Sequence, residues 1–113
     1  MTIVITNTFT PKLLNGNGKF ALLFRKISLE EAKSLVESNA VVNTINKRPI
    51  VRFLTFALET NLKIPKQPYF LRNGDVILLV VLRVKIPETD FSQEIVENAK
   101  QFVEFYEVRV LPF

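Results

Sequence analysis

Basic residues gather where an apolar helix is predicted to begin. Lys47 and Arg48 directly precede Pro49, and Arg52 lies one turn further along. Proline suits a first helical turn, because its φ is already helical and that turn does not use its missing N–H. The free N–H groups and dipole of a helix N-terminus favour anions. The pattern therefore indicates either an anion site or a solvated basic loop that precedes a core helix.

The helix that starts at Pro49 is predicted to span residues 49–60 and to be apolar on most sides. Its apolar positions recur at three- and four-residue spacing, namely Ile50, Phe53, Leu54, Ala57 and Leu58. This arc is wider than one sheet normally covers, and large apolar patches tend to mark interfaces. We therefore predict a homodimer that uses part of the face from Ile50 to Leu58. Two-fold symmetry would place two copies of the Lys47 loop around one cleft.

The composition excludes several classes of function. The 113 residues contain no Cys and no His, which removes cysteine catalysis and the usual general acid–base group. Carboxylates are then the only strong metal ligands, and no pair of them has metal spacing. We expect no metal, no cofactor and, without an apolar run of about 18 residues, no membrane span. The lack of Cys fits an intracellular or high-temperature setting.

Charge is unevenly spread along the chain, whose net charge is +4. From residue 43 to residue 72, Glu59 is the one acidic residue among six basic ones, whereas acidic residues dominate from Thr89 onward. Such a patch can steer an anionic ligand. The charge alone also allows a DNA- or RNA-binding protein, although the sequence contains no DNA-binding motif and no phosphate-binding glycine loop.

The predicted elements form one α/β domain over residues 1–113. Strands are expected at residues 2–9, 19–27, 69–72, 76–84 and 102–111, with Asn73-Gly74 as a hairpin turn between the third and fourth. Helices are expected after the capping box from Ser28 to Glu31, from Pro49, and from residue 91 to residue 101 with Asp90 as a cap. We predict a single layer fold with a mixed five-stranded sheet and about three helices.

Taken in this order, the chain resembles a family of small archaeal-virus proteins that includes the viral ring nucleases, which act as type III anti-CRISPR proteins. Ile5-Thr-Asn-Thr-Phe-Thr10 is similar to the family's first strand and the Asn-Ala-Phe-Ser segment after it. Asn43-Thr-Ile-Asn-Lys47 falls where the family has Ala-Ile-Gly-His. Asn73-Gly-Asp75 with residues 82–88 resembles the Gly-Asp turn, strand and Arg-Leu-Pro-Glu motif, and residues 105–110 resemble the closing strand.

The resemblance implies metal-independent cleavage of cyclic tetra-adenylate in the host cytoplasm. In that reaction a ribose 2′-hydroxyl attacks the adjacent phosphodiester, and the histidine protonates the departing 5′-oxygen. Here Lys47 occupies the histidine position, Asn46 the glycine position and Lys85 the arginine position, whereas Glu88 matches directly. The implied catalytic residues are therefore Lys47, Lys85 and Glu88. The implied ligand-binding residues are Asn7, Thr10, Lys12, Asn46, Lys47, Arg48 and Lys85.

These departures favour binding over catalysis. The unperturbed pKa of a lysine side chain is about 10.4, which is poorly matched to proton donation at neutral pH. A lysine in place of arginine also gives up two-point contact with phosphate. The main hypothesis is a homodimeric module that sequesters a cyclic oligoadenylate or a similar anionic nucleotide. The alternatives are a weakened ring nuclease, a DNA- or RNA-binding protein, and a structural or interaction subunit that has no ligand.

Overall fold

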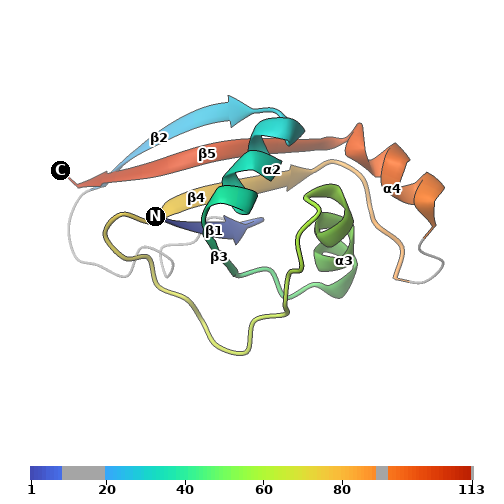
Figure 1. The fold of residues 1–113 in the computed structure, drawn as a ribbon, viewed down its shortest axis with the longest axis horizontal. Helices are drawn as coiled ribbons and strands as arrows, with labels where there is room; N and C mark the ends of the chain where they lie inside the picture. The colour runs from blue at the N-terminus through green and yellow to red at the C-terminus, as the bar shows by residue number, and fades with distance from the viewer. Residues whose placement is uncertain (9–19, 89–91, 113) are drawn as a thin grey trace.

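Five strands form one mixed sheet in the order β2-β5-β4-β1-β3 (Figure 1). The structure is a computed structural model that describes residues 1–8, 20–88 and 92–112. β1 is parallel to β3 and β4, while β5 is antiparallel to β2 and β4. The strands are β1 (Thr2–Thr6), β2 (Phe20–Ile27), β3 (Ala40–Asn43), β4 (Val76–Leu82) and β5 (Val103–Pro112).

Three helices accompany this sheet in the described part of the chain. They are α2 (Leu29–Ser38), α3 (Arg48–Ala57) and α4 (Gln93–Lys100). In Figure 1, α2 crosses one face of the sheet, and α3 and α4 lie toward the end at which β1 and β4 finish. The predicted class, a mixed five-stranded sheet with three helices, is confirmed.

The first turns of α2 and α4 are capped by serine side chains. Ser28 Oγ accepts from the Glu31 N–H, and the Glu31 carboxylate accepts from the Ser28 N–H, both at 3.1 Å, so the predicted capping box is formed. In α4 the cap is Ser92, whose Oγ accepts from the Ile95 N–H at 3.3 Å. Asp90, the cap expected from the sequence, lies outside the described residues.

The central helix α3 starts one residue earlier than predicted and ends sooner than residue 60. Arg48 is its first residue, so Pro49 lies within the first turn. At the other end, Glu59 adopts a left-handed φ of 53°, and the Thr60 N–H donates to the Thr55 carbonyl at 3.2 Å. This is the backbone geometry of a Schellman-type helix end, which stops the helix at Ala57.

One predicted strand is wrong and one strand was missed. Residues 69–72 are not a strand, because the Asp75 carboxylate accepts from the Tyr69 hydroxyl at 2.7 Å and from the Arg72 N–H at 2.9 Å. The predicted Asn73-Gly74 turn does form, with Gly74 at a φ of 89°, but it joins an irregular segment to β4 rather than two strands. The strand that was not predicted is β3, which has four residues and lies at one edge of the sheet.

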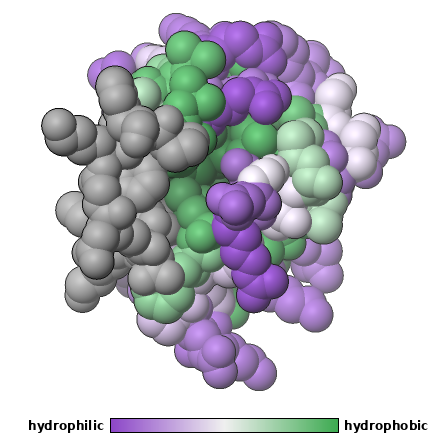
Figure 2. All heavy atoms as spheres, turned by 90° about the vertical axis from the view of Figure 1, so that its left-hand side faces the viewer, coloured by the Kyte–Doolittle hydropathy of each residue, from purple (hydrophilic) through white to green (hydrophobic). Residues whose placement is uncertain are grey.

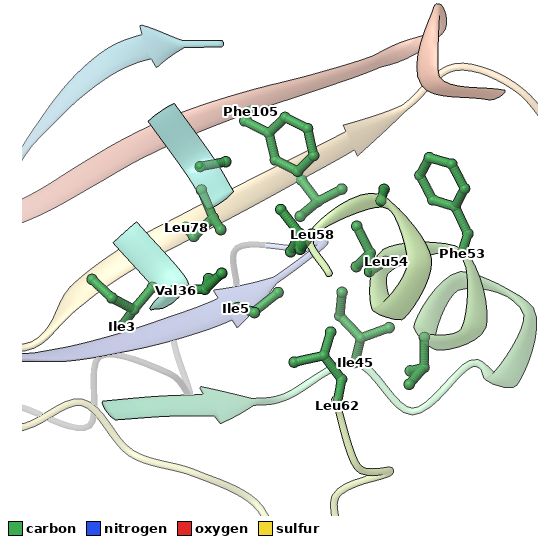
Figure 3. Close-up of a cluster of buried hydrophobic side chains, with 14 of the residues drawn as sticks. Ile3, Ile5, Val36, Ile45, Phe53, Leu54, Leu58, Leu62, Leu78 and Phe105 are labelled. Carbon is green, nitrogen blue, oxygen red and sulfur yellow. The ribbon is translucent and has the colours of Figure 1, made fainter. Parts of the chain in front are cut away.

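The helices bury one face of the sheet in a large apolar core (Figure 3). The sheet side is supplied by Ile3, Ile5, Leu78 and Phe105. The helix side includes Phe53 and Leu54 of α3, with Leu58 directly after the helix. Because the chain itself buries most of α3, the helix offers less surface to a partner than its sequence implied. Of its large apolar side chains, Phe56 remains 57% exposed.

The opposite face of the sheet has a smaller apolar cluster. Val4, Ile77 and Val108 are buried there, and Tyr69 and Leu71 pack against them. The segment predicted as a strand therefore covers the sheet instead of extending it. Figure 2, which views the left-hand side of Figure 1, shows apolar residues gathered beside hydrophilic ones at that end of the molecule.

Within the described ranges, no helix has the length and apolar character needed to span a bilayer.

Candidate functional site

Three parallel strands finish at the same end of the sheet, and each is followed there by a segment that contains polar residues. β1 leads to Asn7, β3 leads to the loop of residues 44–47, and β4 leads to residues 83–86. The crevice beyond the carboxyl ends of parallel strands is where open α/β sheets commonly bind ligands. The fold therefore brings the loop before α3 and the segment after β4 to one end of the sheet.

Hydrogen bonds fix the loop that carries Lys47. The Thr44 N–H and hydroxyl both donate to the Ile5 carbonyl, at 2.9 and 2.8 Å. The Asn43 amide donates at 2.9 Å to the carbonyls of Ile45 and Lys63, and its oxygen accepts from the Ile45 N–H at 3.0 Å. Asn43 thereby ties the loop to the segment that follows α3, and this holds Lys47 at the start of the helix.

A pocket of about 400 Å³ lies between the start of α3 and the segment after β4. Its lining residues are Lys47, Ile50, Leu82, Arg83, Val84, Lys85 and Ile86. Three of these are cationic, four are aliphatic and none is acidic. Lys47 and Lys85, predicted from distant parts of the sequence, thus share one pocket, and both are exposed. This arrangement suits an anion that also has an apolar part.

The other predicted site residues lie beside this pocket or outside the described chain. Asn46 and Arg48 are exposed next to Lys47 but do not line the pocket. Glu88 is exposed, and its carbonyl accepts from Arg52 Nη1 at 3.5 Å, which places it near α3. Thr10 and Lys12 lie outside the described residues.

Asn7 is exposed at the same sheet edge but is not part of the pocket wall. The register explains this position, because Thr6, the last residue of β1, pairs with Leu79. β4 continues to Leu82 before it releases the pocket segment. Lys47 and Lys85 therefore line the same pocket, whereas Asn7 lies outside its wall because β1 ends before β4 does.

Sequence patterning did not point to Arg83, which also lines the pocket. Its Nε donates to Glu104 Oε1 at 2.7 Å. Glu104 also accepts from the Tyr106 hydroxyl, and Lys26 Nζ lies 3.8 Å from its second oxygen. The hydrogen bonds from Tyr106 and Arg83 lower the pKa of Glu104 to about 2. In the sequence, the feature that could have pointed to Arg83 is its position as the first charged residue after the apolar run of β4.

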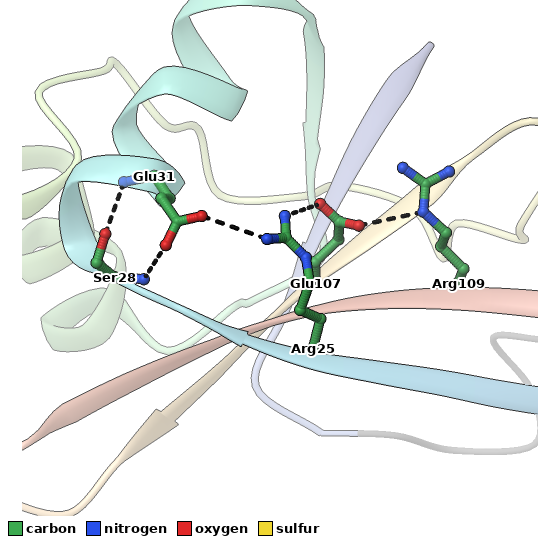
Figure 4. A network of polar contacts seen from close by, with 5 residues as sticks. All are labelled: Arg25, Ser28, Glu31, Glu107 and Arg109. Atoms are coloured by element: carbon green, nitrogen blue, oxygen red, sulfur yellow. Dashed lines mark hydrogen bonds and ion pairs between the residues drawn. The ribbon is translucent and has the colours of Figure 1, made fainter.

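A second polar network lies elsewhere on the sheet (Figure 4). Glu107 is 7% exposed and accepts from Arg25 Nη2 at 3.0 Å and from Arg109 Nε at 3.1 Å. Burial by itself raises the pKa of Glu107, but the hydrogen bonds from Arg25 and Arg109 outweigh it and lower the pKa. Arg25 also reaches Glu31 at 3.4 Å, which connects β2 to the cap of α2. None of these residues lines the pocket; the network joins β2 and β5 to the start of α2.

Metal-binding clusters are not found in the part of the chain that the structure describes. No group of three or more acidic side chains gathers there as a metal site would require. The described wall of the pocket presents ammonium and guanidinium groups beside aliphatic side chains.

Comparison with known proteins places this fold and sequence among viral relatives. The chain is 23% identical over 86 residues to "Uncharacterized protein 26" of Sulfolobus islandicus filamentous virus (isolate Iceland/Hveragerdi), covering 76% of this chain and 72% of that protein. Its fold is similar to that of B116 of Sulfolobus turreted icosahedral virus, with a TM-score of 0.76 and 17% identity, covering 96% of this chain and 98% of that one. Residues 3–106 match the STIV B116-like family, so this chain belongs to that family of archaeal-virus proteins.

Proposed function

We propose that the protein binds an anionic nucleotide of the cyclic oligoadenylate class in the pocket between α3 and the segment after β4. The observation that carries this proposal is that Lys47 and Lys85 line one pocket, and that none of the described residues in its wall is acidic. Two ammonium groups in such a setting attract phosphate. The aliphatic side chains of the same wall offer apolar contacts to a base or a ribose.

The size of the pocket supports a homodimer as the binding unit. At about 400 Å³ it lies near the lower end of small-molecule pockets, which range over about 300–1,000 Å³. One nucleotide unit suits that scale better than a ring of four. A two-fold dimer would present two such pockets to a single cyclic ligand. We propose this assembly as the form that acts inside the infected host cell.

Binding without rapid cleavage fits the side chains in the pocket. The resemblance to ring nucleases implies a proton donor for the departing 5′-oxygen, and the chain has Lys47 at that position. General acid catalysis is most effective when the donor's pKa is near the working pH, and an ordinary lysine is far above it. The function that the pocket supports best is therefore sequestration.

Calorimetry on the purified protein tests this proposal. The wild type should bind cyclic tetra-adenylate more tightly than linear tetra-adenylate or duplex DNA. Lys47→Ala and Lys85→Ala should each weaken binding by about 10- to 100-fold, as expected for loss of one charge-assisted hydrogen bond. Lys66→Ala is the matched control, because Lys66 is an exposed lysine outside the pocket wall.

The pattern of results separates the hypotheses. Equal affinity for all three nucleic acids, with a steep dependence on salt, would support general nucleic-acid binding instead. The absence of binding to any of them would exclude the nucleotide proposal. Equal loss of affinity in Lys66→Ala would show that overall charge, and not the pocket, attracts the ligand.

A further inference from the structure

We infer that Arg83 supplies the phosphate-binding guanidinium of this pocket and that Glu104 is the positioning residue that orients it. The inference rests on the proposed nucleotide site and adds one contact residue and its support. Arg83 lies in the pocket wall with Lys47 and Lys85. Among the described residues of that wall it is the one arginine, and neither the sequence pattern nor the resemblance assigns it a role.

The backbone of Arg83 is held in place at the end of β4. Its N–H donates to the Phe102 carbonyl at 2.8 Å, which extends the pairing with β5 just beyond the last strand residue. The side chain extends from this fixed position and is 62% exposed. A residue with a fixed backbone and an exposed guanidinium is well placed to meet a ligand.

Glu104 restricts the guanidinium in turn. The Arg83 Nε donates to Glu104 at 2.7 Å, so one edge of the planar group is occupied. Glu104 is anchored through the Tyr106 hydroxyl and by its place on β5, opposite Val81 of β4. The low pKa of Glu104, about 2, keeps this carboxylate ionised across the working pH range.

This arrangement gives the pocket a phosphate contact that a lysine cannot make. A guanidinium presents five N–H donors in a fixed plane, and Nε uses one of them. The two terminal nitrogens can then contact two oxygens of one phosphate side by side. Lys47 and Lys85 act only as point charges, so Arg83 is the side chain that can set the orientation of a phosphodiester.

The test compares four single variants and one double variant by calorimetry with cyclic tetra-adenylate. Arg83→Gln should weaken binding by about 10- to 100-fold, and Arg83→Lys should recover only part of the loss because it restores charge without the planar fork. Arg109→Gln is the matched control: the Nε of Arg109 also donates to a glutamate, Glu107, at 3.1 Å, but outside the pocket wall. Its affinity should stay within about twofold of wild type.

The Glu104→Gln variant separates two explanations, because they predict opposite changes in the affinity for the ligand. Removing a negative charge beside a cationic pocket should strengthen anion binding if electrostatics alone matters. If Glu104 orients Arg83, the same change should weaken binding, by about 3- to 10-fold. In the Arg83→Gln background, Glu104→Gln should cause no further weakening, because there is no guanidinium left to orient. Thermal denaturation of each variant checks that the fold is retained.

Three results would overturn the inference. One is unchanged affinity in Arg83→Gln while Lys47→Ala and Lys85→Ala still weaken binding, which would leave the proposed function standing. Another is tighter binding by Glu104→Gln, which would show that the carboxylate only opposes the anion. Failure of the wild type to bind any nucleotide would remove the proposed function and this inference together.

Discussion

Glu104 gives the protein a defined sensitivity to acid. Its pKa falls from an ordinary value of 4.5 to about 2, first because of the Tyr106 hydrogen bond and then because of Arg83. A carboxylate with a lowered folded-state pKa stabilises the fold above its unfolded-state pKa. That contribution should disappear as the pH falls from about 4.5 to about 2. Wild type should therefore be more stable than Glu104→Gln at neutral pH, and the difference should vanish near pH 2.

Thermal melts of both proteins over this pH range measure the effect. Tyr106→Phe is the informative companion, because it removes the largest cause of the pKa shift and keeps the carboxylate. Because its folded-state pKa would lie closer to the unfolded-state value, its acid-dependent loss of stability should be smaller than in wild type and should be complete at a higher pH. A stability difference between wild type and Glu104→Gln that is constant across the range would contradict the prediction.

Replacing Lys47 alone should not produce fast ring cleavage. Lys47→His supplies a donor of suitable pKa, about 6.5 before perturbation, but a proton donor must also reach the 5′-oxygen. Asn46 stands where the resembled family has glycine, and Lys85 stands where it has arginine. Fast cleavage should therefore need His, Gly and Arg together at positions 47, 46 and 85, with Glu88 retained.

Single-turnover assays on the wild type, the single variant and the triple variant test this expectation. Fast cleavage by Lys47→His alone would show that only the proton donor is missing. Rapid turnover by the wild type would count against sequestration, and it would favour the alternative of a working ring nuclease.

Some residues of the pocket can be predicted from the amino-acid sequence, and others cannot. Lys47 can be predicted because basic residues at a helix start are visible in the chain order, whereas Lys85 is indicated by the resemblance, in which it takes the place of the motif arginine. Arg83 is equally visible, but its role depends on Glu104, a partner that follows from the β4–β5 register. Register of an antiparallel pair depends on how the whole sheet assembles, and a single sequence does not state it.

Among the elements, the loop between β3 and α3 is held in part by the side chain of Asn43. Asn43 makes hydrogen bonds with Ile45 and Lys63, so Asn43→Ala should lower the free energy of unfolding by about 1–3 kcal/mol. It should also weaken cyclic tetra-adenylate binding, because Lys47 would lose its fixed position. Chemical denaturation and calorimetry measure the two effects.

The control for this variant is Asn98→Ala, an exposed change on α4 far along the chain. Its stability and affinity should remain close to those of wild type. Full ligand affinity in Asn43→Ala, despite reduced stability, would show that the loop does not need this support to present Lys47.

Helices were easier to predict than strands for a physical reason. Caps and three-to-four spacing are local signals, and they located α2 and α3. β3 has only four residues, and its pairing partner β1 lies far away in the sequence. Residues 69–72 have strand-like composition, but the hydrogen bonds to Asp75 turn them across the sheet face. Tertiary contacts therefore outweigh local propensity in both cases.

For the whole molecule, we expect a homodimer at micromolar concentration. We propose Phe56 on α3 as the anchor of this dimer, since it is 57% exposed on the helix that also lines the pocket through Ile50. Phe56→Glu should shift the protein to a monomer, because burial of an unpaired charge opposes association. Small-angle scattering gives the mass of both forms.

Thr55→Glu is the neighbouring control for added charge at a half-buried position. It is expected to leave more dimer than Phe56→Glu does. A wild-type protein that scatters as a monomer would remove the dimer proposal and weaken the case for a ring-shaped ligand.

The place of β1 in the sheet affects how the chain can fold during synthesis. β1 is made first and its Ile3, Val4 and Ile5 are fully buried, yet its neighbours β3 and β4 are made later. Such non-local pairing folds slowly, over roughly milliseconds to seconds. Among the strands that the structure describes, β2 pairs with β5 alone, and β5 is the last of them to be made. A nascent chain that stops before β5 would therefore leave β2 with no strand beside it, and the sheet in two pieces.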